Sequence, residues 1–132
     1  MQTAAETYRG SPSIQTVLVV DDEVLIRLAI VEELRAAGLM AVEAASGDEA
    51  ILILRMANSI GLVITDVHMP GDTDGFALIA WLRREMPHIK IIVISGRAVT
   101  HGVADAGYSK PFDMEALVHR ARDLLSGTPS PG

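Results

Sequence analysis

Acidic, hydroxyl and basic residues stand directly after the most apolar segments of this sequence. Carboxylates bind hard divalent cations and can act as nucleophiles, while an ammonium or a hydroxyl group can stabilise developing negative charge. Such a set suits chemistry on an anionic group that is rich in oxygen. The residues concerned are Asp21, Asp22, Thr65, Asp66, Ser95 and Lys110.

Each of these residues also has an ordinary structural explanation. Asp21 and Asp22 could cap a helix, and Asp66 could lie in a turn. Ser95 could belong to a loop, and Lys110 could be a solvated surface lysine. Independent structural roles would not, however, place every one of these groups at the same edge of one sheet, so the elements that carry them decide between the two interpretations.

Three segments, 17–20, 62–64 and 91–94, are wholly apolar. Strands that are covered on both faces of a parallel sheet have this pattern, because neither side meets water. Two more polar segments, 40–44 and 107–109, are typical of strands at the edges of such a sheet. The pattern therefore predicts five strands.

Segments with a helical period lie between the predicted strands. The first ends at Gly38, the second, at 46–58, opens with a capping box, and the third ends at Pro87. The last begins near Asp113 and ends at Gly127. The apolar positions that indicate these helices are Ile26, Ile30, Leu34, Ala37, Phe76, Ile79, Leu82, Leu117, Ala121 and Leu124.

Alternating strands and helices predict an α/β fold, a doubly wound parallel sheet with right-handed crossovers and helices on both faces. Ligands of such sheets bind beyond the carboxyl ends of the strands, where all the residues named first would meet. We expect one domain at 14–126, with a flexible N-terminal tail at 1–13 and a C-terminal tail at 127–132.

Three carboxylates at one place repel one another, and a hard divalent cation is the simplest way to hold them. The chain has no cysteine, so oxygen ligands favour Mg²⁺, with Mn²⁺ as an alternative. Such an ion usually also binds phosphate oxygens. We therefore predict a phosphoryl site in which Asp66 is the nucleophile and Lys110 and Ser95 neutralise charge. The sequence contains no P-loop motif, so nucleotide binding of that kind is not indicated.

The composition excludes several classes of function. Acidic residues outnumber basic ones 17 to 11, the formal charge is −6 and no basic cluster occurs, so we expect no direct nucleic acid binding. No apolar run approaches the roughly 18 residues of a membrane span, and residues 1–15 do not resemble a secretory signal. We expect a cytoplasmic protein that makes no membrane contact.

Several motifs together resemble the receiver domain of two-component response regulators, over roughly residues 16–125. The resemblance implies the flavodoxin-like strand order 2-1-3-4-5 and a bacterial signalling domain. It also implies a phosphoacceptor that assists its own phosphorylation and dephosphorylation, not an enzyme. The motifs are Val-Asp-Asp at 20–22, Thr-Asp-Val-His-Met-Pro at 65–70, Asp-Gly at 74–75, Ser-Gly at 95–96 and Lys-Pro-Phe at 110–112.

The resemblance also assigns roles to individual residues. Asp22 would bind Mg²⁺ directly, Asp21 would lie nearby, often with water between, and Asp66 would be phosphorylated. The backbone carbonyl of His68 would complete the protein ligands of the metal. Ser95 would contact the phosphoryl group and draw its loop inward, and Lys110 would contact that group too. A cis bond between Lys110 and Pro111 is a further implication.

This sequence departs from the family in two ways. Only 14 residues separate Ser95 from Lys110, so the family's fourth helix should be shortened or missing around 98–104. Gly107 occupies the place of the family's usual switch aromatic, three residues before the lysine. Tyr108 stands one position later, where a strand presents its side chain to the opposite face, so either the switch is altered or Tyr108 is a core residue.

The leading hypothesis is a stand-alone phosphoacceptor. Asp66 would receive a phosphoryl group from a histidine kinase or phosphotransfer protein, and phosphorylation would alter binding to a downstream protein. The expected state is a monomer or weak homodimer. An alternative is a phosphorylation-independent interaction module with a receiver fold. A phosphohydrolase is disfavoured, because such enzymes generally need an acid two residues after the nucleophile, where this chain has His68. We expect the side chains of His68, His88, His101 and His119 to be exposed.

Overall fold

The computed structural model describes residues 15–69, 71, 73–96 and 104–127 of the 132-residue chain. Within them, five strands form one parallel sheet in the order β2-β1-β3-β4-β5, as predicted. The predicted tails at 1–13 and 127–132 lie outside the described residues except for Gly127, which is the C-cap of the last helix. The elements in chain order are β1 (Thr16–Val20), α2 (Val24–Ala36), β2 (Met40–Ala44), α3 (Gly47–Met56), β3 (Ile60–Asp66), α4 (Gly75–Glu85), β4 (Lys90–Ser95), β5 (Ala106–Ser109) and α5 (Met114–Ser126).

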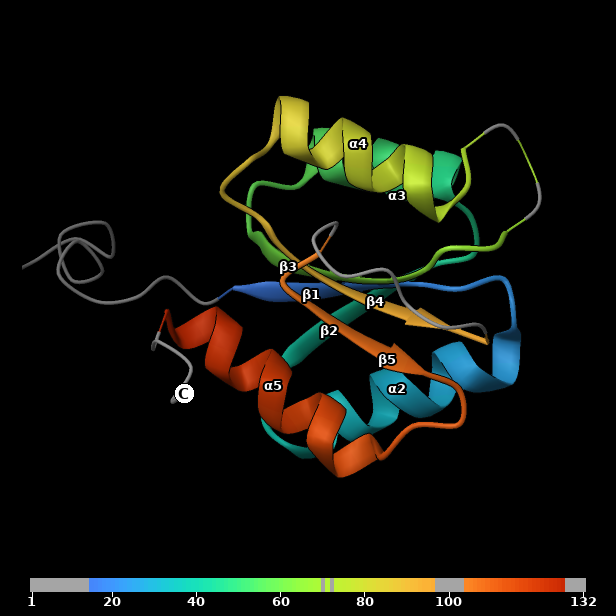
Figure 1. The fold of residues 1–132 in the computed structure, drawn as a ribbon. Coiled ribbons are helices and arrows are strands. Elements are labelled where there is room, and N and C mark those ends of the chain that lie inside the picture. Colours follow the sequence, from blue (N-terminus) through green and yellow to red (C-terminus); the bar gives the residue numbers. More distant parts are fainter. Residues whose placement is uncertain (1–14, 70, 72, 97–103, 128–132) are drawn as a thin grey trace, which may run out of the picture.

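Two pairs of helices cover the two faces of the sheet (Figure 1). Helices α3 and α4 lie on one face, and α2 and α5 lie on the other. Every residue of β1 and β3 is buried, because these strands lie inside the sheet under both helical layers. The more polar β2 and β5 lie at the two edges, as their composition predicted.

Each face of the sheet has its own apolar core. Leu78 and Leu82 of α4 pack with Leu54 of α3 on one side, and Leu34 of α2 packs with Leu117 of α5 on the other. The helical periods predicted the burial of Leu34, Leu82 and Leu117, with one correction. Phe76, on the apolar stripe of its predicted helix, has 46% of its surface exposed instead of lying in the core.

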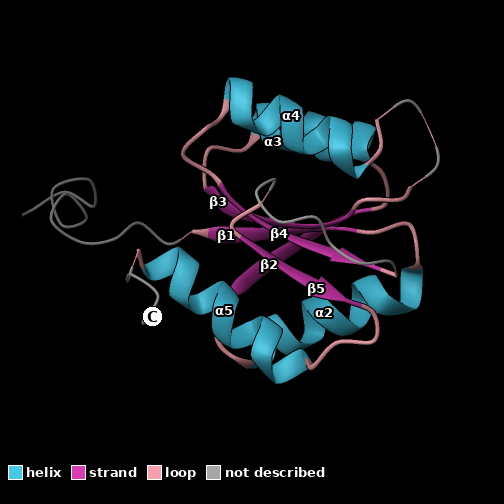
Figure 2. Ribbon diagram, in the orientation of Figure 1, coloured by secondary structure: helices cyan, strands magenta, loops and turns pink. Residues whose placement is uncertain are grey.

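The helix boundaries follow the capping residues. The Ser46 hydroxyl accepts a hydrogen bond from the Glu49 amide (3.1 Å), and the Glu49 carboxylate accepts one from the Ala45 amide (3.0 Å), which confirms the predicted capping box. Helix α5 begins after Asp113, and Gly127 caps its C-terminal end. The φ of Gly127 is 72°, a left-handed conformation that glycine adopts readily because it has no side chain. Figure 2 shows helices on both sides of the strands.

The connection between β4 and β5 is described only at its ends. Gly96, Ala104 and Asp105 belong to no helix, and the shortened helix predicted around 98–104 lies almost wholly outside the described residues. The Asp105 carboxylate accepts a hydrogen bond from the Ile91 amide at 2.8 Å, which ties the start of β5 to the start of β4. None of the helices in the described ranges is long and apolar enough to cross a bilayer.

Candidate functional site

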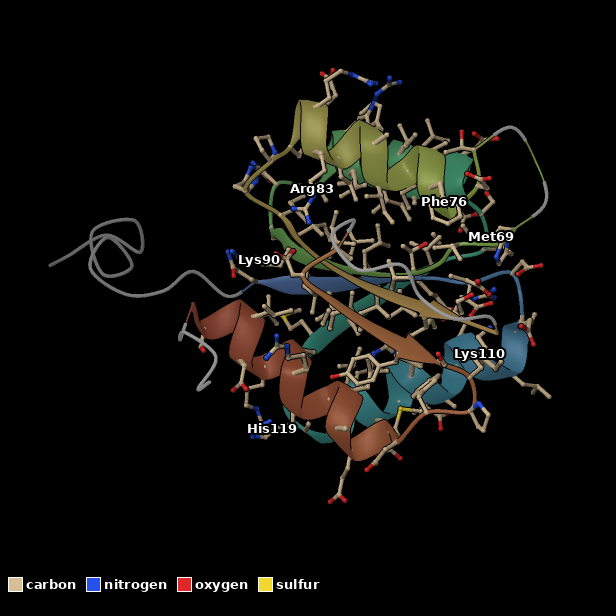
Figure 3. The ribbon with its side chains drawn as sticks, in the orientation of Figure 1. Met69, Phe76, Arg83, Lys90, Lys110 and His119 are labelled. Atoms are coloured by element: carbon tan, nitrogen blue, oxygen red, sulfur yellow. The ribbon has the colours of Figure 1, made fainter. Side chains whose placement is uncertain are left out.

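The carboxyl ends of four strands bring the predicted site residues together. Asp21 follows β1, Asp66 is the last residue of β3, Ser95 is the last residue of β4, and Lys110 follows β5. Figure 3 shows Lys110 at the carboxyl ends of the strands and Lys90 at the opposite ends. The parallel pairing aligns the ends of these strands: Val20 lies beside Thr65, and Ser95 lies beside Ser109.

Three aspartates form a compact carboxylate cluster. One oxygen each of Asp21, Asp22 and Asp66 lies within 4.8 Å of the others. Asp21 and Asp66 are buried, whereas Asp22 is exposed. Ligands of one octahedral Mg²⁺ are about 3 Å apart when adjacent and about 4 Å when opposite. The cluster is close to those spacings and offers only oxygen atoms, so the donor set fits a hard divalent cation.

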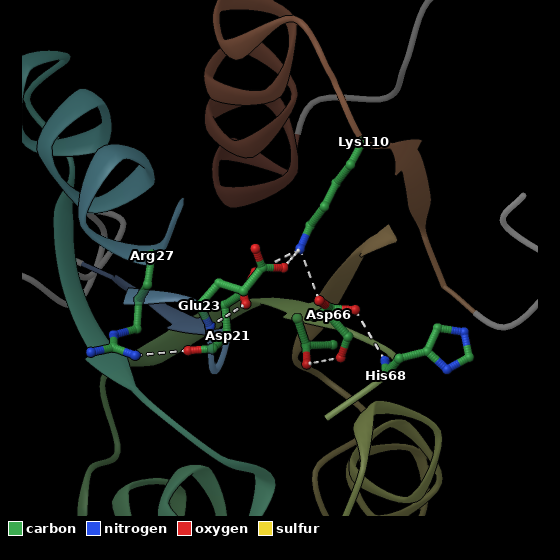
Figure 4. A network of polar contacts seen from close by, with 7 residues as sticks. Asp21, Glu23, Arg27, Asp66, His68 and Lys110 are labelled. Atoms are coloured by element: carbon green, nitrogen blue, oxygen red, sulfur yellow. Dashed lines mark hydrogen bonds and ion pairs between the residues drawn. The ribbon is translucent and has the colours of Figure 1, made fainter. Parts of the chain in front are cut away.

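Lys110 is the cation of this site (Figure 4). Its ammonium donates to Glu23 Oε1 at 2.8 Å, to Asp66 Oδ2 at 2.9 Å and to Asp21 Oδ2 at 3.3 Å. The peptide bond between Lys110 and Pro111 is cis, as the resemblance implied. The Lys110 amide also donates to the Ser95 carbonyl at 2.6 Å, which fixes the lysine backbone beside β4.

Burial and neighbouring charges have opposite effects on the pKa values of Asp21 and Lys110. Burial raises the pKa of Asp21 above its usual 3.8, although the Glu23 amide and Lys110 favour the charged form. For Lys110, burial alone would lower the pKa, but the hydrogen bonds to Glu23 and Asp66 and the charge of Asp21 outweigh it and raise the pKa. The ammonium therefore stays charged throughout the physiological range.

The raised pKa of Asp21 has a consequence for stability. The folded protein holds this proton more tightly than the unfolded chain does, so the contribution favours folding below pH 3.8 and is lost as the pH rises through the folded-state value. Deprotonation of Asp21 in the folded protein therefore carries the cost of a buried charge. A bound cation would offset that cost.

The backbone around Asp66 is held from several sides. Asp66 Oδ1 accepts a hydrogen bond from the His68 amide at 3.0 Å, and the Asp66 carbonyl accepts one from the Thr65 hydroxyl at 2.8 Å. His68 is exposed as predicted, and its ring lies edge-on to Phe76 at 6.1 Å. Its backbone therefore adjoins the carboxylates, while the role of its carbonyl as a metal ligand stays a prediction. His88 and His119 are exposed, and His101 lies outside the described residues.

Gly75 allows α4 to approach the end of β3. A Cβ atom at this position would lie 2.1 Å from the Asp66 carbonyl oxygen and 2.3 Å from Val67 Cα. The Gly75 amide donates to the Val67 carbonyl at 3.1 Å, and the Asp74 carboxylate caps α4 through the Ala77 amide. The Asp-Gly pair at 74–75 thus begins α4 in close contact with the backbone that carries Asp66.

Gly75→Ala should lower the free energy of unfolding by about 1–3 kcal/mol, because the added methyl group must push apart two backbone segments. Chemical denaturation in urea measures this value. Gly96→Ala is the matched control, since a Cβ at Gly96 meets nothing within 4 Å, and its stability should not fall. Equal stabilities of the two variants would contradict the close approach.

Sequence reasoning missed two residues of this site, Glu23 and Arg27. Arg27 donates to the Asp21 carbonyl at 2.8 Å and to Glu43 at 2.7 Å, and so fixes the loop after β1. Glu23 directly follows the aspartate pair, which was a signal that could have been used. The pairing of Arg27 with Glu43 joins α2 to β2, and no local pattern indicates it.

Tyr108 takes the orientation that its position in the strand predicted. It is half-buried and packs in the core between the sheet and α2 and α5, with its hydroxyl 3.5 Å from the Ala116 carbonyl. Burial raises the pKa of this hydroxyl. Gly107, at the place of the family's aromatic, is exposed. Tyr108 is therefore a packing residue on the α5 side of the sheet.

Comparisons with known proteins show which family this chain resembles. The model of the response regulator receiver domain family matches residues 17–122. Sensor kinase CckA of Brucella abortus is 36% identical over 118 residues, covering 83% of this chain and 12% of that protein. A probable transcriptional regulator of Cyanophora paradoxa, ycf27, is 37% identical over 122 residues, covering 87% of this chain and 50% of that protein.

Solved structures show the same fold. The response regulator TrrA of Thermotoga maritima, in complex with Mg²⁺ and BeF, is 30% identical, with a TM-score of 0.75, covering 83% of this chain and 98% of that one. The chain spans half or less of the two curated relatives described above. The five-stranded order, the aspartate cluster and the family match lead to one conclusion: this chain belongs to the response regulator receiver domain family.

Proposed function

We propose that Asp66 accepts a phosphoryl group from the phosphohistidine of a histidine kinase or phosphotransfer protein. The phosphorylated domain then binds a downstream protein differently. The observation that carries this proposal is the surroundings of the Asp66 carboxylate. One of its oxygens accepts from Lys110 at 2.9 Å, the other accepts from the His68 amide at 3.0 Å, and Asp21 and Asp22 complete the cluster.

The transfer needs little covalent chemistry from the protein. An Asp66 oxygen attacks the phosphorus atom, the bond between phosphorus and the histidine nitrogen of the donor breaks, and that nitrogen keeps the electron pair. The reaction therefore depends on position and on neutralisation of charge. The two hydrogen bonds to Asp66 hold its carboxylate in one orientation before the donor arrives.

The proposed metal is Mg²⁺, with Mn²⁺ as an alternative. Asp21, Asp22, Asp66 and the His68 carbonyl would hold it. When bound, the ion neutralises charge on the carboxylates and on the phosphoryl oxygens. The related receiver from Thermotoga maritima was crystallised with Mg²⁺ and BeF, which supports the assignment.

Ser95 and Lys110 are proposed to contact the phosphoryl group. Ser95 is 1% exposed at the end of β4, and its carbonyl accepts from the Lys110 amide. The two residues are therefore held beside each other at the carboxyl ends of β4 and β5.

The test of the proposal is phosphorylation of the isolated protein by acetyl phosphate. The protein is incubated with the donor and Mg²⁺, and its intact mass is measured. We expect a gain of one phosphoryl group, and no gain when EDTA removes the metal. An unchanged mass, under conditions in which a known receiver domain is phosphorylated, would reject the proposal.

One observation favours a second candidate, a phosphorylation-independent interaction module. The family's switch aromatic is replaced by Gly107, and Tyr108 packs on the α5 side instead. A partner-binding surface near α5 would then be the same in the phosphorylated and unphosphorylated protein. Binding of a partner to the wild type and to Asp66→Asn, each with and without acetyl phosphate, separates the two. Equal affinity in all four cases supports the module.

A further inference from the structure

The Lys110 ammonium is shared among three carboxylates. An ammonium group has three hydrogen atoms to donate and no acceptor. Here they go to Glu23, Asp66 and Asp21, at 2.8, 2.9 and 3.3 Å, and Glu23 is the nearest partner. A new anionic partner can therefore gain a hydrogen bond from Lys110 only if one of these carboxylates gives its bond up.

The three carboxylates differ in how easily they can be released. The Asp21 and Asp66 side chains are 0% and 7% exposed, so losing the ammonium would leave a buried charge. The Glu23 side chain is 56% exposed, and water can solvate its carboxylate after it leaves. Glu23 is therefore the partner that Lys110 can exchange at the lowest cost.

The local structure at Glu23 directs its side chain to Lys110. Glu23 is the N-cap residue of α2, yet its side chain makes no capping hydrogen bond. Its amide donates to Asp21 Oδ1 at 2.9 Å, which fixes the backbone beside the site. The side chain thus contacts the lysine across the strand ends instead of stabilising its own helix, as Figure 4 shows.

We infer that Glu23 is a positioning residue that holds Lys110 in the unphosphorylated protein and competes with the incoming phosphoryl group for it. The inference rests on the proposed function, and it means that Glu23 slows the phosphorylation of Asp66. Each phosphorylation event must first separate Glu23 from Lys110. Removal of the Glu23 charge should therefore speed the reaction, whereas loss of an acidic residue that assists the reaction would slow it.

The test compares phosphorylation rates of wild type, Glu23→Gln and Glu32→Gln. Acetyl phosphate is the donor, and Mg²⁺ is saturating, so that a change in metal affinity does not alter the rate. Glu23→Gln should react about two- to five-fold faster, the range expected for an exposed ion pair. Glu32→Gln removes the same charge about two and a half turns further along α2 and should react like wild type.

A double-mutant cycle with Lys110→Gln separates competition for the lysine from repulsion of the donor. If Glu23 acts through Lys110, its substitution should change nothing in the Lys110→Gln background. An equal acceleration in both backgrounds, an acceleration matched by Glu32→Gln, or a rate of Glu23→Gln at or below that of wild type would each overturn the inference. No phosphorylation of wild type would instead reject the proposed function.

Discussion

Lys110→Gln should lower the rate of phosphorylation by acetyl phosphate by about 100-fold or more, the loss typical of one charge-stabilising donor. Lys110 is the one basic side chain in contact with Asp66 among the described residues, and it is 15% exposed, so water replaces it poorly. The variant keeps a hydrogen-bond donor but loses the charge. Intact mass spectrometry over a time course measures the rate.

The chain offers a matched control for this substitution. Lys90 is its only other lysine, and it is exposed at the start of β4, at the opposite ends of the strands from Lys110. Lys90→Gln makes the same chemical change and should react at the wild-type rate. If Lys110→Gln reacted as fast as Lys90→Gln, the ammonium would have no part in phosphoryl transfer.

Mg²⁺ should stabilise the wild-type protein against urea, and Asp22→Asn should remove most of this effect. A ligand that binds only the folded state at 100 times its Kd adds about 2.7 kcal/mol. Asp22 is the exposed member of the cluster, so asparagine there relieves repulsion without leaving a buried carboxylate unpaired. The metal-free variant should therefore be at least as stable as wild type.

Asp123→Asn is the control for the metal prediction. Asp123 lies on α5, pairs with His119 at 3.5 Å and is not part of the aspartate cluster. Mg²⁺ should stabilise this variant as much as wild type. Equal stabilisation of Asp22→Asn and Asp123→Asn would show that the cation acts through general screening and not at the cluster.

The layout of the site could be predicted because it depends on strand direction alone. Apolar runs identified β1, β3 and β4, and the carboxyl ends of parallel strands meet at one edge, which places Asp21, Asp66 and Ser95 together. The position of Tyr108 followed from the same logic, since side chains of a strand alternate between its faces.

The contacts made by long, flexible side chains could not be predicted in the same way. Glu23 is the N-cap residue of α2, but its side chain binds the nearby ammonium, which is a stronger, charged partner than a backbone amide. Arg27 contacts Glu43 across two elements, and no periodic pattern links them. Phe76 has the period of a core residue, yet it lies in the first turn of α4, where its ring is partly exposed and contacts the His68 ring edge-on.

The central claim is that Asp66 carries the phosphoryl group, and the most direct measurement locates that group. The protein is phosphorylated with acetyl phosphate and Mg²⁺, the acyl phosphate is reduced with borohydride, and the peptides are mapped by mass spectrometry. We predict that Asp66, and no other residue, is converted to homoserine, and that Asp66→Asn shows no conversion. Conversion at another acid in the wild type, or equal phosphorylation of Asp66→Asn, would contradict the account.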